Sequence, residues 1–600
     1  MLGNEALGMG LRDAGIKFAS SYPGTPSTEI MDKLQKYSES GELNAGWSIN
    51  EAVAFEEAIA SSIIGIDSAI ICKSVGINVA MDPLMTIANS GTNAAMIIVI
   101  ADDPDMLSSQ NEQDNRMLAF LSNLPIFEPS NVQEAYDIAK DAVLLSRKFK
   151  IPVVIRMVTR ISHAFGMVST QQSSPLPKLE FKSEVSRFVN IPANARKNHK
   201  RILQVHYEIK EYANIQKHWY ETQIGNESDY LVVTSGSTAN YVIDALEDLK
   251  FNAHLFIPKL INPFPQRRLL DLARKYHTIL IIEELEPYLE TRVRNALHVA
   301  KNNVTVLGKH ELNIPRHGEL TVEKLSKALS SRLGLNWVEP KELEPESKNL
   351  IISRPPILCA GCPHRSTYVL LNDVLKRYDP IYCNDIGCYS LGVLPPHNTA
   401  DILICMGASI PMATSISLND SSKLGVAIIG DSTFWHSGLS GLANAIWKKA
   451  DILVVIMDNF TTAMTGNQEN PSSKKKLDIF TTVKAMGAEI LKVNPMDYKA
   501  SKLALRQLMK ENGVKVLLSQ YPCALNSNRN TSSAIDNPTR AMIKSELCNG
   551  CGYCVDKIGC PAFSFCNDQR IPIIDNSLCN GCMYCNQHCH YGAIKKVVLR

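Results

Sequence analysis

Cysteines gather near the C-terminal end of this chain at spacings that suit iron–sulfur clusters. Nine of the sixteen cysteines fall between Cys548 and Cys589. They form one Cys-x2-Cys-x2-Cys-x5-Cys run and one Cys-x2-Cys-x2-Cys-x3-Cys run, and Cys566 belongs to neither. Three cysteines at this spacing wrap one cubane, and the remote fourth ligates the other cluster. The expected ligands of two [4Fe–4S] clusters are Cys548, Cys551, Cys554 and Cys589 for the first, and Cys560, Cys579, Cys582 and Cys585 for the second.

Two details depart from the usual pattern. Five residues separate Cys554 from Cys560 where three are usual, and the second run ends in Cys589-His590 instead of Cys-Pro. Neither removes a ligand. The alternatives are a zinc site, which favours two separated cysteine pairs, and loose structural thiols. We interpret the surplus Cys566 as a small buried hydrophobe.

Candidate oxygen ligands follow two apolar runs between residues 424 and 458. Asp431 directly follows LGVAIIG (424–430), and Asn459 follows DILVVIMD (451–458), 28 residues further on. One β-α-β crossover would bring these side chains together at the same sheet edge. Carboxylate, amide and carbonyl oxygens suit Mg²⁺ or Ca²⁺ holding a diphosphate, and the intervening helix offers its N-terminus to that anion. Taken alone, Asp431 would more often be a turn or capping residue.

This arrangement resembles the signature of thiamine diphosphate (ThDP) enzymes, which opens Gly-Asp-Gly and ends in Asn about 28 residues on. In this chain Gly430 and Asp431 are followed by Ser432 instead of the second glycine. By this resemblance, Asp431, Asn459 and the carbonyl of Thr461 would bind Mg²⁺, and Gly430 and Ser432 would line the diphosphate site.

A glutamate in the N-terminal part is the expected partner of the ThDP aminopyrimidine ring. The segment WSINEAVAFEEAIA places Glu51 at the start of a helix, with a glycine turn at Gly76 after the next strand. This resembles the pyrimidine domain of 2-oxoacid:ferredoxin oxidoreductases, where such a glutamate promotes loss of the thiazolium proton. We therefore prefer Glu51 to Glu56 and Glu57. Its alternative role is that of a first-turn acid favoured by the helix dipole.

The whole chain, from residue 3 to the end, resembles the large α subunits of the indolepyruvate:ferredoxin oxidoreductase family. Besides the motifs above, the likeness rests on segments 22–27 (YPGTPS), 101–116, 359–365 (CAGCPHR) and 459–468. It implies that Thr25 contacts the substrate's 2-oxo acid group and that Arg116 pairs with the substrate carboxylate. Alone, Thr25 would be interpreted as a turn former.

A third cluster is an open alternative. Related β subunits hold a cluster near the cofactor through four cysteines, and comparable positions here are Cys359, Cys362, Cys388 and Cys523. The other interpretation is that these are buried thiols, as expected for Cys383 and Cys405 nearby. Spacing alone does not show whether the four thiols converge.

The resemblance implies a reaction and a set of partners. The expected reaction is oxidative decarboxylation of an arylpyruvate, with coenzyme A as acyl acceptor and electrons passing through the clusters to ferredoxin. A smaller β subunit and an α2β2 heteromer are also implied. One alternative is a non-oxidative decarboxylase, which would need no electron outlet. Another is a non-catalytic electron-transfer or scaffold subunit with a vestigial ThDP fold.

Short apolar runs between amphipathic stretches predict the elements that position these residues. Runs at 68–72, 95–101, 151–157 and 278–284 alternate with helical stretches such as 51–64 and 131–147, which is typical of parallel, doubly wound α/β sheets. Polar segments at 168–200 and 335–356 are interpreted as linkers. The expected fold is α/β, with three ThDP-type (transketolase-like) domains and a small α+β ferredoxin-like domain. The expected domains are 1–167 (pyrimidine-binding type), 190–335 (transketolase C-terminal-like), 357–530 (diphosphate and Mg²⁺ binding) and 540–600 (two clusters).

Composition excludes some function classes. The formal net charge of +2 over 600 residues gives no reason to expect nucleic acid or a membrane surface as a partner. No apolar run approaches the roughly 18 residues of a membrane helix, and the N-terminus lacks the pattern of a signal peptide. We expect a cytoplasmic protein.

Overall fold

The computed structural model describes residues 1–171, 176–223, 228–340, 355–473, 476–529, 539–565 and 570–598. The chain divides into two compact units, Met1–Glu344 and Pro345–Arg600. Each unit is an α/β structure built around parallel sheets. Cys566 and most of the predicted linker at 335–356 lie outside the described residues.

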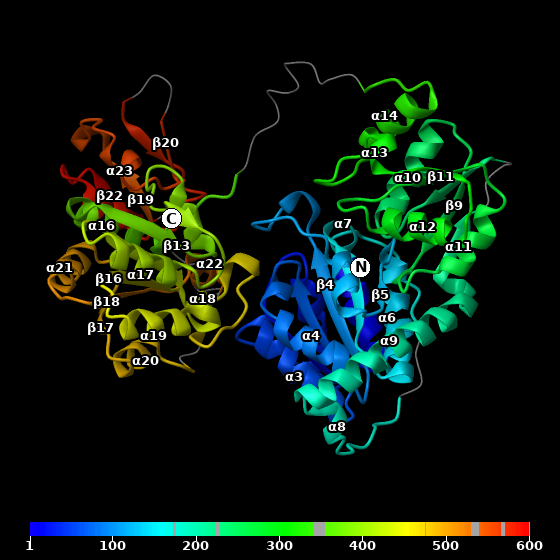
Figure 1. Ribbon diagram of the computed structural model, residues 1–600. Helices are drawn as coiled ribbons and strands as arrows, with labels where there is room; N and C mark the ends of the chain where they lie inside the picture. The colour runs from blue at the N-terminus through cyan, green and yellow to red at the C-terminus, as the bar shows by residue number, and fades with distance from the viewer. Residues whose placement is uncertain are drawn as a thin grey trace. The chain divides into compact units, whose positions relative to one another are not determined.

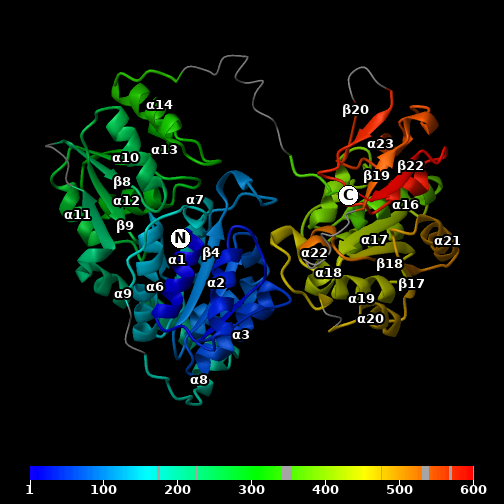
Figure 2. The same cartoon turned by 180° about the vertical axis from the view of Figure 1, so that it is seen from behind.

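The N-terminal unit contains a seven-stranded sheet in the order β10-β5-β6-β4-β3-β1-β2. Its central strand β4 (Met96–Asp102) is buried along its whole length, as expected for a parallel strand covered on both faces. Helices α4 and α9 cover the face seen in Figure 1, and α1 and α2 cover the face seen in Figure 2. The other elements are β1 (Phe18–Ser21), β2 (Asn44–Trp47), β3 (Ser68–Lys73), β5 (Ile126–Phe127), β6 (Val153–Val158), α1 (Gly3–Asp13), α2 (Thr28–Glu39), α3 (Glu51–Ile63), α4 (Met81–Ser90), α6 (Val132–Phe149) and α9 (Pro192–Ile215).

The alternation read from the sequence is confirmed in this sheet. The apolar runs at 68–72, 95–101 and 151–157 form β3, β4 and β6. Two asparagine caps set the starts of the predicted helices. The Asn50 side chain accepts a hydrogen bond from the backbone N–H of Val53 at 2.8 Å, and Asn131 accepts one from Glu134 at 2.9 Å. Such caps satisfy donors that the first helical turn leaves unpaired.

A second sheet in the same unit has the order β12-β11-β8-β9-β7, with β7 antiparallel to β9. Strand β10 (Leu260–Asn262) leaves this region and pairs antiparallel with β5, so it completes the first sheet. The Asn262 side chain also donates to the carbonyl of Leu124 at 2.6 Å. The two regions of this unit are therefore joined through a shared sheet. The elements of the second region are β7 (Tyr220–Gln223), β8 (Tyr230–Val233), β9 (His254–Pro258), β11 (Thr278–Ile281), β12 (Thr305–Leu307), α10 (Thr238–Asp248), α11 (Gln266–Ala273), α12 (Tyr288–Val299) and α14 (Val322–Leu333).

The predicted linker at 168–200 is wrong in its last part. Helix α9 begins at Pro192 and runs for 24 residues. Its first turns are polar, which hides a buried stripe of Ile202, Val205, Ile209 and Ala213 at helical spacing. These residues pack into the main core of the unit, so tertiary burial overrides a composition typical of a linker.

The C-terminal unit contains a six-stranded parallel sheet in the order β14-β13-β15-β16-β18-β17. Strands β15 and β16 are neighbours, with Gly430 opposite Met457 at their carboxyl ends. The elements are β13 (Pro380–Asn384), β14 (Ile402–Leu403), β15 (Leu424–Gly430), β16 (Ile452–Asp458), β17 (Glu489–Val493), β18 (Val514–Gln520), α16 (Pro363–Leu375), α17 (Ser409–Asn419), α18 (Asp431–Thr433), α19 (Leu439–Trp447), α20 (Ile479–Ala485), α21 (Tyr498–Leu508) and α22 (Ala524–Arg529).

The cysteine-rich tail consists of two small antiparallel pairs. Strand β19 (Thr539–Ile543) pairs with β22 (Ile594–Val598), and β20 (Phe563–Phe565) pairs with β21 (Pro572–Ile574). The tail packs on α16 of the same unit, where Val369 joins a core with Ile558 and Tyr584. Among the helices that the structure describes, none combines the length and apolar character needed to cross a bilayer.

Candidate functional site

The predicted oxygen ligands of the C-terminal unit lie at one edge of its sheet. Asp431 begins α18 directly after β15, and Asn459 directly follows β16. The Thr462 hydroxyl donates to the Ser432 hydroxyl at 2.9 Å, so the segments after the two strands touch. A π-helical turn, Phe434–Gly438, follows α18, an irregularity frequent at functional sites.

These side chains are buried and oriented by local hydrogen bonds. The carboxylate of Asp431 is 3% exposed and accepts from the Asn470 side chain at 2.9 Å. The amide oxygen of Asn459 accepts from the backbone N–H of Thr461 at 3.2 Å. Burial raises the pKa of Asp431 well above its usual range, and the neighbouring carboxyl of Asp458 adds to this shift. A buried pair of acidic groups is a place where a bound cation would be stabilised.

Asp458 and Asn470 were not singled out from the sequence. Asp458 ends β16 and its carboxylate accepts from the Gln520 side chain at 2.6 Å. Asn470 lies in a loop, and its side-chain oxygen accepts from the backbone N–H groups of Ser472 and Ser473. Only the position of Asp458 beside Asn459 could have indicated a role.

Close packing at Gly430 brings the segment of Cys388 to the same edge. A Cβ at Gly430 would lie 2.5 Å from the ring of Tyr389, so no other residue fits without movement. The Tyr389 hydroxyl donates to the Thr433 hydroxyl at 3.1 Å. Cys388 thus lies near the start of the helix that carries Asp431.

In the N-terminal unit, Glu51 begins α3 and is 5% exposed. Its side chain packs against Gly76, where a Cβ would lie 2.6 Å from the carboxylate Oε1 of Glu51. Gly76 follows β3 in a short 3-10 turn. The structure therefore brings the predicted glutamate and the predicted glycine turn into contact.

The Thr25 turn lies beside a loop that follows β4. The Ser108 hydroxyl donates to the Thr25 carbonyl at 3.1 Å. Lys73, the last residue of β3, donates from Nζ to the Ser108 carbonyl at 2.9 Å, and its methylene groups pack against Gly24. Burial lowers the pKa of Lys73, while Asp103 and Glu51 oppose the shift. Sequence reasoning missed this cation; its only signal was a lysine that ends a buried strand.

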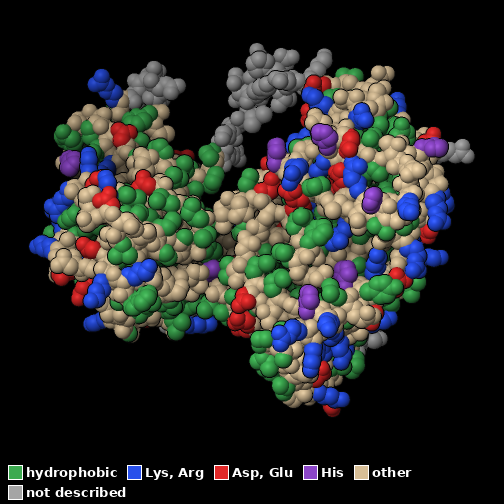
Figure 3. All heavy atoms as spheres, in the orientation of Figure 1, with side chains coloured by type: hydrophobic (Ala, Val, Ile, Leu, Met, Phe, Trp, Pro, Cys, Tyr) green, Lys and Arg blue, Asp and Glu red, His purple; other side chains and the backbone are tan. Residues whose placement is uncertain are grey.

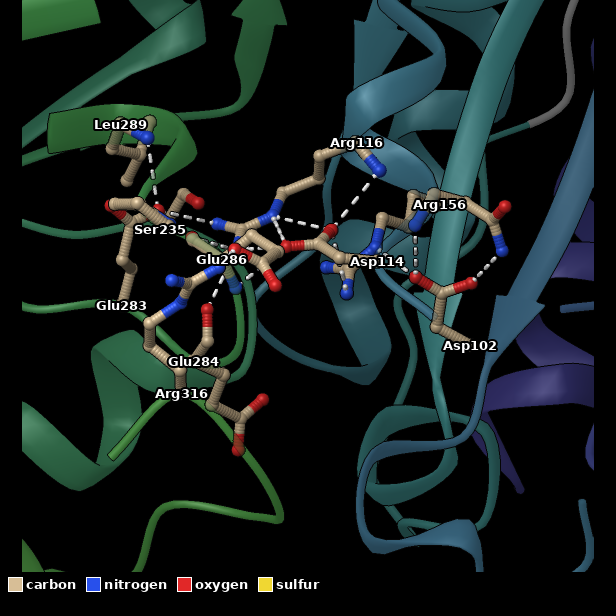
Figure 4. A network of polar contacts seen from close by, with 12 residues as sticks. Asp102, Asp114, Arg116, Arg156, Ser235, Glu283, Glu284, Glu286, Leu289 and Arg316 are labelled. Carbon is tan, nitrogen blue, oxygen red and sulfur yellow. Dashed lines mark hydrogen bonds and ion pairs between the residues drawn. The ribbon is translucent and has the colours of Figure 1, made fainter. Parts of the chain in front are cut away.

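Arg116 belongs to a buried ionic network between the two regions of the N-terminal unit (Figure 4). Its guanidinium is 2% exposed and pairs with Asp114 at 2.6 Å and with Glu283 at 2.9 Å. The same group also donates to the backbone carbonyls of Glu284 and Glu286. Because its nitrogens are engaged within the protein, the predicted role in binding a substrate carboxylate is left without structural support.

A second arginine extends this network. Arg156 pairs with Asp102 and with Glu128, each at 2.6 Å. Burial raises the pKa of Glu283 to about 7, against the opposing effect of Arg116. The network thus has a positioning role: it holds the loop after β11 on the first sheet.

The eight tail cysteines line two cavities in the predicted sets. One cavity is lined by Cys560, Cys579, Cys582 and Cys585, and another is lined by Cys548, Cys551, Cys554 and Cys589. Burial raises the pKa of Cys554 to about 11, with further contributions from Cys589, Cys548 and Cys551. Each remote fourth cysteine therefore lies with the opposite triplet.

The four candidate ligands of a third cluster also lie near one another. Burial raises the pKa of Cys388 to about 12, and the thiols of Cys362, Cys523 and Cys359 add to the shift. Cys383 has a different environment, with Asp401 and Asp385 as its acidic neighbours.

Within the described ranges, no three His, Cys, Asp or Glu side chains lie close enough to hold one metal ion. A cubane is larger than an ion, so its four thiolates surround a cavity instead of converging on a point. The expected Mg²⁺ site combines one carboxylate with amide and carbonyl oxygens, so it would not form such a cluster either. The donor chemistry at both kinds of site fits the expected groups.

Two parts of the chain match families of ThDP-binding domains. Residues 9–225 match the family described as "Pyruvate flavodoxin/ferredoxin oxidoreductase, thiamine diP-bdg". Residues 385–518 match "Thiamine pyrophosphate enzyme, C-terminal TPP binding domain". The solved 2-oxoglutarate:ferredoxin oxidoreductase of Magnetococcus marinus aligns with 56% of this chain and 65% of its own, at 17% identity and a TM-score of 0.44.

Full-length relatives share one name. "Indolepyruvate oxidoreductase subunit IorA" of Pyrococcus abyssi is 36% identical over 100% of this chain and 96% of its own length. The protein of the same name from Methanothermobacter marburgensis is 35% identical over 99% of this chain and 97% of its own. The chain therefore belongs to the indolepyruvate oxidoreductase subunit IorA family, oxidoreductases of the 2-oxoacid:ferredoxin oxidoreductase superfamily.

Proposed function

We propose that this protein is the electron-exporting large subunit of an oxidoreductase that decarboxylates arylpyruvates, with coenzyme A as acyl acceptor and ferredoxin as electron acceptor. The observation that carries the proposal is that one compact unit contains both the Asp431–Asn459 edge and two cavities, each lined by four of the eight predicted tail ligands. A non-oxidative decarboxylase would have no use for such cavities. The arylpyruvate is proposed from the name of the full-length relatives.

In the C-terminal unit we propose a site for the diphosphate and Mg²⁺ of ThDP. Asp431, Asn459 and the Thr461 carbonyl would hold Mg²⁺, because these are hard oxygen donors at one buried edge. Gly430 and Ser432 would line the diphosphate. When bound, ThDP supplies an electron sink for the decarboxylated 2-oxo acid.

In the N-terminal unit, Glu51 would hold and move a proton at the aminopyrimidine ring. Its burial against Gly76 keeps the carboxylate in one position and keeps water away from it. This packing requires that residue 76 has no side chain. Glu51 is therefore the catalytic residue of the proposal.

Thr25 and Lys73 would bind the substrate. Both contact Ser108, so the threonine turn and the lysine are held by one loop. A half-buried ammonium group can bind a carboxylate, and Lys73 replaces Arg116 as our candidate because Arg116 is already paired with carboxylates.

The three cysteine sets would hold [4Fe–4S] clusters, which store and pass single electrons when bound. The two tail cavities support the two clusters predicted from spacing. The proximity of Cys359, Cys362, Cys388 and Cys523 supports a third. Because the segment of Cys388 reaches Gly430, the third set would receive electrons first.

A smaller β subunit and an α2β2 assembly are part of the proposal. The face of the C-terminal unit in Figure 3 carries many exposed apolar side chains. Trp447 at the end of α19 is 78% exposed, and Ile404 is 61% exposed. Exposed apolar surface is typical of sites where another chain binds.

The test is anaerobic reconstitution of the chain, with its partner subunit, using iron, sulfide, ThDP and Mg²⁺. We expect dye reduction that depends on indolepyruvate or phenylpyruvate and exceeds that with pyruvate. Glu51→Gln should lower the rate by roughly 10²–10⁴-fold while ThDP still binds. Full activity of this variant, or no ThDP binding by the wild type, would contradict the proposal.

A further inference from the structure

A buried arginine lies between two of the cysteine sets. Arg365 is on α16, three residues after Cys362, and is 5% exposed. It lines the same cavity as Cys560 and Cys582, together with Cys362. Its position is therefore fixed between the CAGCPHR segment and the tail.

The hydrogen bonds of Arg365 go to backbone carbonyls on both sides. One terminal nitrogen donates to the carbonyls of Ile558, at 3.2 Å, and Gly559 in the tail. The other donates to the carbonyls of Leu358 and Cys359 in the segment before α16. The guanidinium thus connects the two segments that carry the cysteines.

These bonds do not neutralise its charge. Among the described residues, the acidic groups with the largest effect on Arg365 are the thiols of Cys560, Cys362 and Cys359, and its Nε has no hydrogen-bond partner there. A buried cation without an anion is expensive. Four-thiolate clusters are anions, so a bound cluster would supply the negative charge that Arg365 lacks among the described residues.

The two cysteine loops also touch each other. The Asn580 side chain, between Cys579 and Cys582, donates to the Ala360 carbonyl at 3.3 Å. A Cβ at Gly361, between Cys359 and Cys362, would overlap that asparagine. Gly361 has a φ of +71°, a conformation that favours glycine. Any clusters in these sets would be neighbours, with Arg365 beside both.

We propose that Arg365 is a positioning residue that serves as the shared counter-cation of two clusters, one held by the Cys359 set and one by the Cys560 set, and raises the reduction potential of both. This proposal rests on the proposed function. Reduction adds one electron to a cluster and breaks no bond, so the negative charge beside Arg365 increases by one. A fixed cation therefore stabilises the reduced form more than the oxidised form. Cys548, Cys551, Cys554 and Cys589 line a different cavity, whose lining does not include Arg365, so a cluster held there should respond least.

The test is an electrochemical titration of the anaerobically loaded protein, followed by electron paramagnetic resonance. We expect Arg365→Gln to lower two midpoint potentials and to change the third least. Arg365→Lys should recover part of the shift because it retains the charge. Arg377→Gln is the matched control, because Arg377 follows the same helix but is exposed.

Each outcome separates this inference from the proposed function. If the wild type itself binds no clusters, the proposed function fails. If all variants keep wild-type iron content and wild-type potentials, Arg365 is only structural and the inference fails. If Arg365→Gln loses iron, Arg365→Lys decides: retained iron with near wild-type potentials supports the role of the charge, and equal iron loss contradicts it.

Discussion

Two buried arginines of this protein have opposite surroundings. Arg116 in the N-terminal unit pairs with the carboxylates of Asp114 and Glu283. Arg365 in the C-terminal unit is about equally buried, yet its hydrogen bonds go to carbonyls and its acidic neighbours are thiols. The first charge is neutralised by the folded chain itself. The charge of Arg365 has no carboxylate partner among the described residues, and a bound cluster would supply the anion.

The difference shows how to separate structural from functional buried charge. A buried cation that already has carboxylate partners has a structural role, even when it lies in a sequence motif that suggests function. A buried cation without them indicates a missing anion. Lys73 is an intermediate case, because its Nζ donates to a carbonyl while its methylene groups are packed against Gly24.

The largest expected effect is that of removing the neutralised arginine. Arg116→Met removes the cation nearest to the buried carboxylates of Asp114 and Glu283 and should lower the free energy of unfolding of the N-terminal unit by about 3–5 kcal/mol. Denaturant unfolding measures this change. The exposed Arg267→Met is the control, with an expected loss below about 1 kcal/mol. A small loss for Arg116→Met would remove the contrast between the two arginines.

The same network predicts a pH dependence. The pKa of Glu283 is about 7 in the folded protein and 4.5 ordinarily, so the folded state binds more protons between pH 4.5 and 7. Stability contributed by this group is therefore lost as the pH rises through that window, by about 3 kcal/mol in total. Unfolding of Glu283→Gln should show a correspondingly flatter pH profile. An identical slope in both proteins would count against the assignment.

Removing iron should weaken the effect of an arginine substitution. In chelator-treated protein, Arg365→Met deletes a cation that has no carboxylate partner among the described residues, but it also removes hydrogen bonds to backbone carbonyls, so we expect the free energy of unfolding to change by less than about 2 kcal/mol. In iron-loaded protein the same change should destabilise. Denaturant unfolding of both forms measures the effect, with Arg377→Met as control. A large destabilisation of the iron-free variant would place Arg365 in the same class as Arg116.

The smallest effect concerns substrate binding. Lys73→Met should raise the KM for arylpyruvate about tenfold, which corresponds to about 1.4 kcal/mol, without changing ThDP affinity. Lys73→Arg should restore part of the loss, and Lys36→Met, an exposed change on α2, should have no effect. An unchanged KM in Lys73→Met would mean that another residue binds the substrate carboxylate.

What could be predicted from the sequence follows from how local each feature is. The buried strands depend on short spacings, and β3, β4 and β6 form where the apolar runs predicted them. The cysteine triplets also depend on short spacings, and the cysteines line two cavities, while their role as cluster ligands stays a prediction. The transfer of β10 to the first sheet depends on pairing over more than a hundred residues, which no local pattern shows.

The site residues divide in the same way. Glu51 and Gly76 belong to one motif and lie in contact. Arg116 was taken from a motif too, but its partner Glu283 lies 167 residues away in sequence, so its neutralisation could not be foreseen. The candidate roles of Lys73 and Arg365 depend on burial and on neighbours that are distant in sequence, so no local pattern indicated them.

The most direct test of the account is a single-turnover reduction of the clusters. The loaded protein with its partner subunit, ThDP and Mg²⁺ is mixed anaerobically with an arylpyruvate and coenzyme A, then frozen for electron paramagnetic resonance. We expect reduced-cluster signals that require both ThDP and the arylpyruvate and that are lost in Glu51→Gln at unchanged iron content. Signals of equal size in Glu51→Gln, or no reduction in the wild type, would contradict the claim that this chain couples 2-oxoacid decarboxylation to electron export.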